Sequence, residues 1–283
     1  VQSALLDPFW SPILHGIESE AQQRRLQFVY RGRVGPNQLD VDKICVELSA
    51  NNHCGVLLVG PAPIEYLQAF KRTAAPLVLI DHHVPHQGVD AVLGDNFDGA
   101  RMAVAHLIVA GHQQIAMIGG PTVWQPGPVN LIYTLEQRMA GYRAALLEAG
   151  LPLDERLYVA SDLTSESGYR AATELLARDV NFTGLFCGND LAAIGAIKAL
   201  AEHNRRVPED VSVVGFDDID IAQHLTPALS TVRLHKEAMG RLAVQRLLDR
   251  ANDVTLMPVL QTLDVDFIAR ESVMPPNPSR QHA

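Results

Sequence analysis

The stretch DNFDGARMAVAHLIVAGHQQIAMIGG, residues 95–120, contains one complete step from helix to strand. Ala100, Val104 and Leu107 repeat at the three- and four-residue spacing of a helix, and a glycine after them supplies a stop signal. The continuous apolar run at 115–118 then predicts a strand that is covered on both faces. The stretch is therefore typical of a parallel sheet with helices on each side.

The same step recurs on both sides of this stretch. Apolar runs predict strands at 55–59, 77–80, 115–118, 185–187 and 211–216, with a weaker candidate at 27–30. Apolar periodicity predicts helices at 13–24, around 139–146, after Asp190 and around 236–250, and period-2 alternation marks 260–268. Alternation of strands and helices over this length indicates an α/β fold with right-handed crossovers.

The 283 residues are enough for about two domains, and a Pro/Gly-rich connector beginning at Gly119 separates two sets of strands. We predict an N-terminal lobe over 1–122, to which about 233–255 returns. The C-terminal lobe is predicted over 123–232, together with about 256–273. The last residues, 274–283, contain three prolines and no apolar pattern, so we expect a loose tail.

Charge and cysteine content exclude several classes of protein. The 23 Lys and Arg against 32 Asp and Glu give a net charge of −9, and no basic run appears, which argues against a nucleic-acid groove. Cys45, Cys54 and Cys187 are an odd number without a C-x-x-C pair, which predicts neither a disulfide framework nor a Cys-rich zinc site. The unpaired cysteines fit a reducing, cytoplasmic location. No apolar stretch approaches the ~18 residues of a membrane span, so we expect no membrane partner.

Common catalytic motifs are absent from the sequence, so we predict no enzymatic activity, no cofactor and no metal. G-x-S-x-G, the phosphate-binding loop, G-x-G-x-x-G after a strand and H-E-x-x-H do not occur. Asp217 and Asp218 are adjacent after a strand, where side chains point apart, so a shared-proton pair is not expected. His82, His83 and His86 share a loop with a proline and are interpreted as exposed loop residues.

Polar residues follow the predicted strands, where parallel sheets bind ligands. Asp81 follows 77–80, Asn189 and Asp190 follow 185–187, and Asp217 and Asp218 follow 211–216. Asp190 precedes an apolar helix and is interpreted as its N-cap. Turn formation and ligand contact both remain open for Asp218, while Asn189 and Asp217 are the better candidates for binding.

Aromatic residues and one arginine complete the candidate set. Phe9 and Trp10 precede a predicted helix and form either a hydrophobic staple or an apolar wall for a ligand. Trp124, in the connector, has the same two interpretations. Arg138 is predicted to open the 139–146 helix, where a positive charge opposes the helix dipole, and this misfit favours a functional role.

These residues resemble the lactose-repressor (LacI/GalR) family of transcription regulators over nearly the whole chain. The matching stretches are DNFDGARMAVAHLIVAGHQQIAMIGG from Asp95, RMAGYRAALLEAG from Arg138, NDLAAIGAIKAL from Asn189, RVPEDVSVVGFDDIDIA from Arg206, TPALSTVR from Thr226 and MGRLAVQRLLD from Met239. The resemblance implies a periplasmic-binding-protein-like fold: two doubly wound parallel-sheet lobes, joined by three crossovers, with a small effector between them. It also implies a homodimer and a DNA-binding headpiece of about 60 residues ahead of Val1, which agrees with a start that lacks Met.

The resemblance also assigns effector-binding positions. They are the aromatic pair Phe9 and Trp10, the acidic Asp81, the oxygen-gripping Arg138, the strand-end residues Phe186 and Asn189, and the carboxylate Asp217. Arginine matches vicinal oxygens and carboxylates accept from hydroxyls, so a polyhydroxylated, sugar-like effector suits this set. The chain departs from the family in its first strand, of which only residues 1–6 are present, and in the long connector that contains Trp124.

Two functions follow as hypotheses. The first is the effector-binding and dimerisation core of a LacI-family regulator, in which ligand-driven lobe closure controls operator binding by a separate headpiece. The second is an extracytoplasmic sugar-binding protein that serves a transporter. The segments GFDDIDIA and STVR and the three unpaired thiols favour the regulator.

Overall fold

The computed structural model of the chain describes residues 7–31, 41–50, 53–120, 133–178 and 180–277. The chain divides into two compact units. Unit 1 comprises Val1–Gly94 and His235–Asp264, and unit 2 comprises Asp95–Leu234 and Val265–Ala283. The chain therefore passes between the units three times, after Gly94, Leu234 and Asp264.

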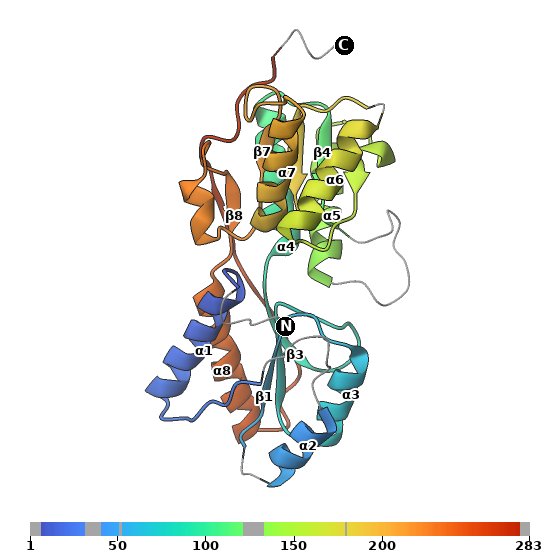
Figure 1. Cartoon of the computed structure of the whole chain (residues 1–283). Helices are drawn as coiled ribbons and strands as arrows, with labels where there is room; N and C mark the ends of the chain where they lie inside the picture. Colours follow the sequence, from blue (N-terminus) through green and yellow to red (C-terminus); the bar gives the residue numbers. More distant parts are fainter. Residues whose placement is uncertain (1–6, 32–40, 51–52, 121–132, 179, 278–283) are drawn as a thin grey trace. The chain divides into compact units, whose positions relative to one another are not determined.

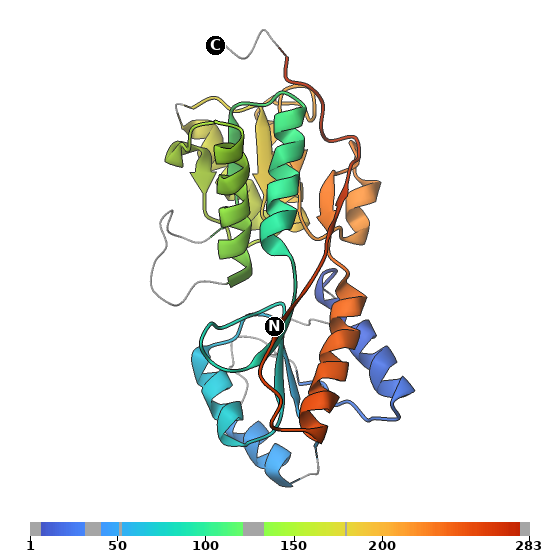
Figure 2. The ribbon, with the colours of Figure 1, turned by 180° about the vertical axis from the view of Figure 1, so that it is seen from behind.

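Unit 1 contains a four-stranded parallel sheet. Its strand order is β1 (Val56–Val59), β2 (Leu77–Ile80), β3 (Asp90–Gly94) and β9 (Leu260–Leu263). Helices α1 (Trp10–Gln23) and α8 (Lys236–Asn252) lie on one side of the strands, and α2 (Val41–Ala50) and α3 (Ile64–Arg72) lie on the other (Figures 1 and 2). Because helices cover both faces, every residue of β2 is buried, as expected for a continuous apolar strand.

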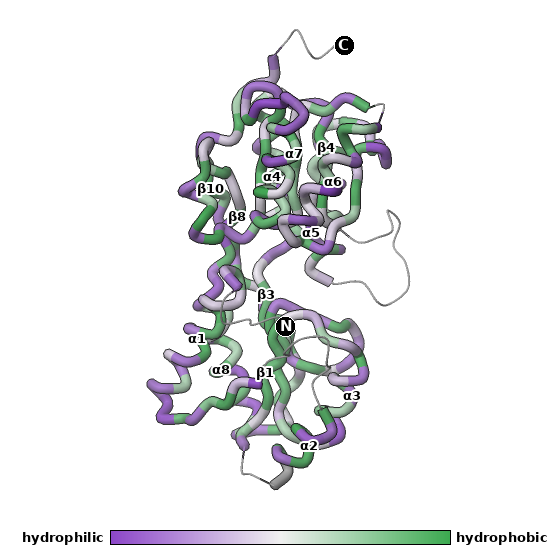
Figure 3. The backbone as a smooth tube through the Cα atoms, in the orientation of Figure 1, coloured by the Kyte–Doolittle hydropathy of each residue, from purple (hydrophilic) through white to green (hydrophobic). Residues whose placement is uncertain are grey.

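Unit 2 contains a second four-stranded parallel sheet. Its strand order is β5 (Tyr158–Val159), β4 (Ile115–Ile118), β6 (Gly184–Cys187) and β7 (Ser212–Val214). Helices α6 (Ser165–Ala177) and α7 (Asp190–Glu202) cover one face, and α4 (Asn96–Val109) and α5 (Tyr133–Glu148) cover the other, as the front and back views show (Figures 1 and 2). Figure 3 shows hydrophobic residues along the labelled strands β1, β3 and β4.

A short antiparallel ribbon completes unit 2. Strand β8 (Thr231–Arg233) pairs with β10 (Asp266–Ile268), so that Arg233 is opposite Asp266. Strand β8 leads into the passage after Leu234, and β10 follows the passage after Asp264. Both strands of the ribbon are thus close in sequence to a change of unit.

The structure confirms most of the predicted strands. The strands at 77–80 and 115–118 have the predicted bounds. Those at 55–59 and 185–187 differ by one residue at the start, and the strand predicted at 211–216 is shorter at both ends. The weaker candidate at 27–30 is wrong, since these residues form no strand. Strands β3 and β5 were not predicted, because β3 begins with an aspartate and β5 has only two residues. No described helix is long and apolar enough to cross a membrane.

The boundaries of the two units differ from the predicted lobes. The predicted first lobe reached residue 122, but β4 pairs with β5 and β6, so residues from Asp95 onward belong to unit 2. The C-terminal part also divides differently, because β9 pairs with β3 in unit 1 and only β10 belongs to unit 2. Met274, predicted in the loose tail, is held through hydrogen bonds to His112 and Ser212. Residues 278–283 lie outside the described residues.

Candidate functional site

The strands of unit 2 end at one edge of the sheet in short turns that contain glycine. Gly119 follows β4, Gly188 follows β6, and Asp217 lies three residues beyond β7. A Cβ atom on Gly188 would lie 2.2 Å from the backbone oxygen of Gly119, so the two turns approach each other closely. Only a glycine fits there without displacing the neighbouring backbone.

Arg138 extends from α5 into this edge and is 3% exposed. Its Nε donates to Asn96 Oδ1 at 2.8 Å, Nη1 donates to the backbone oxygen of Gly188, and Nη2 lies 3.2 Å from Asp217 Oδ1. The guanidinium also stacks over the Phe216 ring, 3.9 Å from its centroid. The side chain thus joins α4 and the ends of two strands.

Helix α5 begins at Tyr133, so Arg138 does not open it. The sequence-based argument from the helix dipole is therefore wrong, because that effect is confined to the first turn. What singles out Arg138 is its burial. A charge removed from water needs a partner of opposite charge, and Asp217 provides it.

Asp217 is also buried, and its backbone has an uncommon conformation. Its φ of 105° lies in a region that residues other than glycine rarely adopt. Its N–H donates to Val232 O at 2.8 Å, and its carboxylate faces Arg138. The Asp217 carboxylate therefore lies at the carboxyl edge of the sheet, and Arg138 of the same unit neutralises its charge.

Phe186 lies on β6 and is fully buried, so its side chain packs in the core of unit 2. Its ring meets Phe216 edge-on, with 6.4 Å between the centroids. Phe216 in turn lies beneath the Arg138 guanidinium. In this conformation Phe186 supports the arginine indirectly.

Asn189 is the N-cap of α7, and the predicted assignment of this role to Asp190 is wrong. The Oδ1 atom of Asn189 accepts from the N–H of Ala192 at 2.8 Å, and its Nδ2 donates to Leu163 O at 3.0 Å. An amide can bond both groups at once, whereas a carboxylate could only accept. Asn189 is thus held by two contacts within unit 2.

Asp190 is fully buried beside the site. Its Oδ1 shares a hydrogen bond of 2.6 Å with the Thr231 hydroxyl, and its Oδ2 accepts from the N–H of Ile219 at 2.8 Å. Burial, and next the charge of Asp217, raise the pKa of Asp190 to about 8. The carboxyl group is therefore largely protonated at neutral pH.

The candidate residues of unit 1 gather at the carboxyl edge of its own sheet. Phe9 is the N-cap of α1 and Trp10 is its first residue, and their rings meet edge-on with 4.6 Å between the centroids. A Cβ atom on Gly60, directly after β1, would lie 2.9 Å from the Trp10 ring. Asp81, directly after β2, is 5% exposed and has a φ of 53°. Unit 1 thus presents an aromatic pair and a carboxylate at one edge.

Two further sequence predictions concern the loop histidines after β2 and Trp124. His82, predicted to be an exposed loop residue, is 8% exposed, while His83 is half-buried and His86 is exposed. Burial, and then the neighbouring histidines, lower the pKa values of His82 and His83, so both are neutral near pH 7. Trp124 lies outside the described residues.

Three contacts of the site were not predicted from the sequence. They involve Asn96, the backbone oxygen of Gly188, and Phe216, all of which bind Arg138. Asn96 and Arg138 are far apart in sequence, so their pairing has no local signal. Gly188 could have been predicted, because a glycine directly after a buried strand often marks a close approach of two backbone segments.

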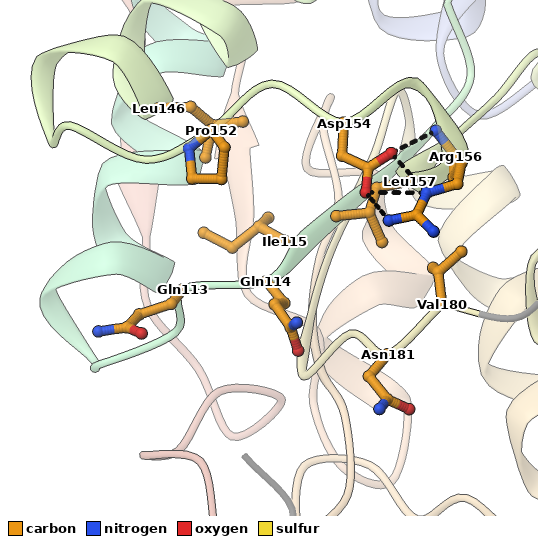
Figure 4. Close-up of a pocket in the computed structure, with 10 residues that line it drawn as sticks. All are labelled: Gln113, Gln114, Ile115, Leu146, Pro152, Asp154, Arg156, Leu157, Val180 and Asn181. Carbon is orange, nitrogen blue, oxygen red and sulfur yellow. Dashed lines mark hydrogen bonds and ion pairs between the residues drawn. The ribbon is translucent and has the colours of Figure 1, made fainter. Parts of the chain in front are cut away.

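A separate pocket of about 200 Å³ lies at the opposite edge of the unit 2 sheet (Figure 4). It is lined by residues that precede β4 and β6, including Gln114 and Asn181, and by the apolar Leu146. Asp154 and Arg156 at its rim bind each other through several hydrogen bonds (Figure 4). Its place at the amino ends of the strands separates it from Arg138 and Asp217.

Comparison with known proteins supports this fold. Residues 104–273 match the model of the periplasmic binding protein-like domain. The HTH-type transcriptional regulator CelR of Thermobifida fusca is 34% identical over 278 residues, which cover 96% of this chain and 78% of the relative. The HTH-type transcriptional repressor PurR of Escherichia fergusonii is 32% identical over 271 residues, 94% of this chain and 76% of that protein.

Solved structures give the same result. A transcriptional regulator CelR–cellobiose complex superposes with a TM-score of 0.82 at 34% identity, covering 94% of this chain and 79% of that one. A LacI family transcriptional regulator from Enterococcus faecium with bound ribose has a TM-score of 0.79 at 27% identity, with 95% of each chain covered.

Two α/β units joined by three passages, with polar groups at the strand ends, define a periplasmic-binding-protein-like ligand-binding protein. The chain belongs to the LacI family of transcriptional regulators, and its residues form the effector-binding core of such a regulator. Its relatives are transcriptional regulators, so the alternative of a binding protein for a transporter is not supported.

Proposed function

We propose that this core binds a sugar-like effector and that binding shifts a conformational equilibrium which controls operator binding. The observation that carries the proposal is the buried pair of Arg138 and Asp217 at the carboxyl edge of the unit 2 sheet. A guanidinium donates to hydroxyl oxygens, and a carboxylate accepts from hydroxyl hydrogens. The pair therefore offers both halves of the hydrogen bonding that a polyhydroxylated molecule needs.

Unit 1 supplies complementary chemistry in this proposal. Asp81 offers a second acceptor, and Phe9 and Trp10 offer apolar surface, of which Trp10 is the more exposed. Apolar walls with a few well-placed polar groups are typical of small-molecule sites. The effector set consists of Phe9, Trp10, Asp81, Arg138, Asn189 and Asp217, with Phe186 as support and Trp124 as a further candidate.

Calorimetric titration tests the class of effector. The complex of the CelR relative contains cellobiose, so cellobiose is the first probe, followed by ribose, other sugars and nucleosides. We expect a sugar to bind and the nucleosides not to. Saturation by a nucleoside, with no heat from any sugar, would reject the proposed effector class.

The remaining partners follow from the family resemblance. The chain is proposed to form a homodimer in the cytoplasm, with α2 and α3 as candidates for the interface and DNA contacts made by a separate headpiece. Val46 on α2 is 68% exposed, which provides apolar surface for such a contact. Analytical ultracentrifugation at tens of micromolar should give a dimer of the 30.9 kDa chain, and a monomer would contradict this proposal.

A further inference from the structure

Asp217 and Asp218 are consecutive residues whose carboxylates bind different parts of unit 2. Their φ angles are 105° and 48°, both in the region that favours glycine. Asp217 faces Arg138, whereas Asp218 binds Arg233 and Arg270. Such a strained turn persists only where surrounding contacts hold it, so the two carboxylates depend on the same local backbone.

Asp218 is held by two charged hydrogen bonds. Its Oδ2 accepts from Arg233 Nε at 2.7 Å, and its Oδ1 accepts from Arg270 Nη2 at 2.6 Å. Partial burial raises the pKa of Asp218, but the two arginines outweigh this effect and hold the pKa below its ordinary value. The carboxylate is therefore ionised at neutral pH and bonds strongly to both partners.

One of the two arginines lies in the ribbon and the other lies just beyond it. Arg233 is the last residue of β8, and Arg270 lies two residues after β10. Arg270 also donates from Nη1 to Leu229 O, just before β8. One carboxylate thus bonds segments adjacent to two of the three passages of the chain.

Strand β8 is also bonded directly to the residues around Asp217. The N–H of Asp217 donates to Val232 O. The Thr231 hydroxyl is hydrogen-bonded to Asp190, which also accepts from the N–H of Ile219. Residues 217–219 are therefore connected to β8 at successive positions. A displacement of β8 must move the backbone that carries Asp217.

We infer that Asp218 is a positioning residue, which holds β8 and β10 so that Asp217 meets Arg138 and thereby couples the ribbon to the effector site. The coupling to effector affinity rests on the proposed function. The positioning of Asp217 against Arg138 does not, because every contact that supports it lies within unit 2.

The first experiment needs no effector. The Arg138 Nε–H signal is recorded by NMR in the full 283-residue chain and assigned through its loss in Arg138→Lys. Asp218→Asn removes a negative charge and Arg270→Gln removes a positive one, yet both disrupt the charged hydrogen bond between Asp218 and Arg270. Positioning predicts that the Arg138 signal shifts in the same direction in both variants. Shifts in opposite directions would reveal a direct effect of charge, and unchanged signals would overturn the inference.

Asp220→Asn is the matched control. Asp220 is two residues away from Asp218, its side chain is 87% exposed, and its described contacts are with Gln223 and His224 on its own helical turn. We expect this variant to leave the Arg138 signal unchanged. If Asp218→Asn does not fold, Arg270→Lys takes its place, because it keeps the positive charge but lacks the guanidinium that bonds Asp218 and Leu229 O together. A shift of the Arg138 signal in the same direction as in Arg270→Gln then supports positioning, and an unchanged signal overturns it.

The second experiment measures affinity for cellobiose by calorimetry. We expect Asp218→Asn to weaken binding at least ten-fold and Asp220→Asn to leave it unchanged. Unchanged affinity in Asp218→Asn would refute the coupling to the effector site. If the parent chain binds no cellobiose, the proposal of that effector fails, while the NMR comparison still decides whether Asp218 positions Asp217.

Discussion

The Nη2 atom of Arg138 lies 3.2 Å from Oδ1 of Asp217, and both side chains are more than nine-tenths buried. Removing two charged side chains from water costs free energy, and a buried ion pair is retained where further hydrogen bonds satisfy its groups. Arg138 has these bonds in Asn96 and Gly188. The pair is thus part of the internal structure of unit 2 as well as a candidate for binding, so substitutions of either residue affect both stability and affinity.

Arg138→Ala should destabilise the protein as well as abolish effector binding. The change leaves Asp217 buried without its cation, which typically costs about 3–5 kcal/mol of unfolding free energy. Urea denaturation measures this loss. Arg170→Ala is the control, since Arg170 is 64% exposed and its ion pair is with the exposed Glu166. A similar stability for the two variants would contradict the assignment.

Asp217→Asn should weaken effector binding less than Asp217→Ala. The amide retains one oxygen that can accept a hydrogen bond, whereas alanine retains none. A charge-assisted hydrogen bond is worth about 1.5–3 kcal/mol, so we expect a loss of roughly ten-fold to more than a hundred-fold for alanine. Calorimetry with the first sugar that binds provides the test. Equal losses in both variants would exclude the carboxylate oxygens as acceptors for the ligand.

Asp190 should make the protein less stable as the pH rises. Its pKa is about 8 in the folded state against 3.8 ordinarily, so between these values the folded state retains a proton that the unfolded state releases. The contribution of this group to stability is therefore complete below about pH 4 and is lost as the pH rises towards 8. Denaturation at pH 5, 7 and 8.5 measures the trend.

Asp190→Asn is the comparison for this pH series. The amide resembles the protonated carboxyl group, with an oxygen for the N–H of Ile219 and an NH₂ for Thr231. We expect its stability relative to the parent chain to increase from pH 5 to pH 8.5. A difference that does not change with pH would show that Asp190 is ionised in the folded state throughout this range.

Gly188→Ala should destabilise unit 2 through a steric clash. The new Cβ would lie 2.2 Å from Gly119 O, and overpacking of this kind typically costs about 1–3 kcal/mol or more. Gly88→Ala separates this effect from backbone strain, because Gly88 has a φ of 63° but no atom near its Cβ position. Thermal unfolding should show a larger decrease for Gly188→Ala. A larger decrease for Gly88→Ala would mean that the turns at Gly119 and Gly188 can move apart at little cost.

The strands were predictable wherever their residues are apolar on both faces. Residues 77–80 and 115–118 form uninterrupted apolar runs, and they form strands with the predicted bounds. Strand β3 was missed because it begins with Asp90, whose buried carboxylate forms ion pairs with Arg246 and Arg250. Those partners lie more than 150 residues away in sequence, and no local pattern reports them.

The candidate site was predictable in its residue types and only partly in its contacts. The positions of Asp81 and Asp217 after their strands follow from the general location of ligand sites in parallel sheets. The burial of Arg138 did not follow, because its helix begins earlier than predicted and its partner Asn96 comes from another helix. Tertiary contacts of this kind depend on the assembled fold.

The division of unit 1 between the two ends of the sequence has a consequence for its synthesis. The sheet of unit 2, from β4 to β7, comes from one continuous segment, so it can form while later residues are still being translated. Unit 1 cannot be completed until α8 and β9 have been synthesised. Helix α8 packs against α1 and the strands β1, β2 and β3, and β9 pairs with β3. Until α8 emerges from the ribosome, Ile13 and Ile17 on α1 lack their covering helix, and a nascent chain stalled before residue 235 should therefore be a chaperone substrate.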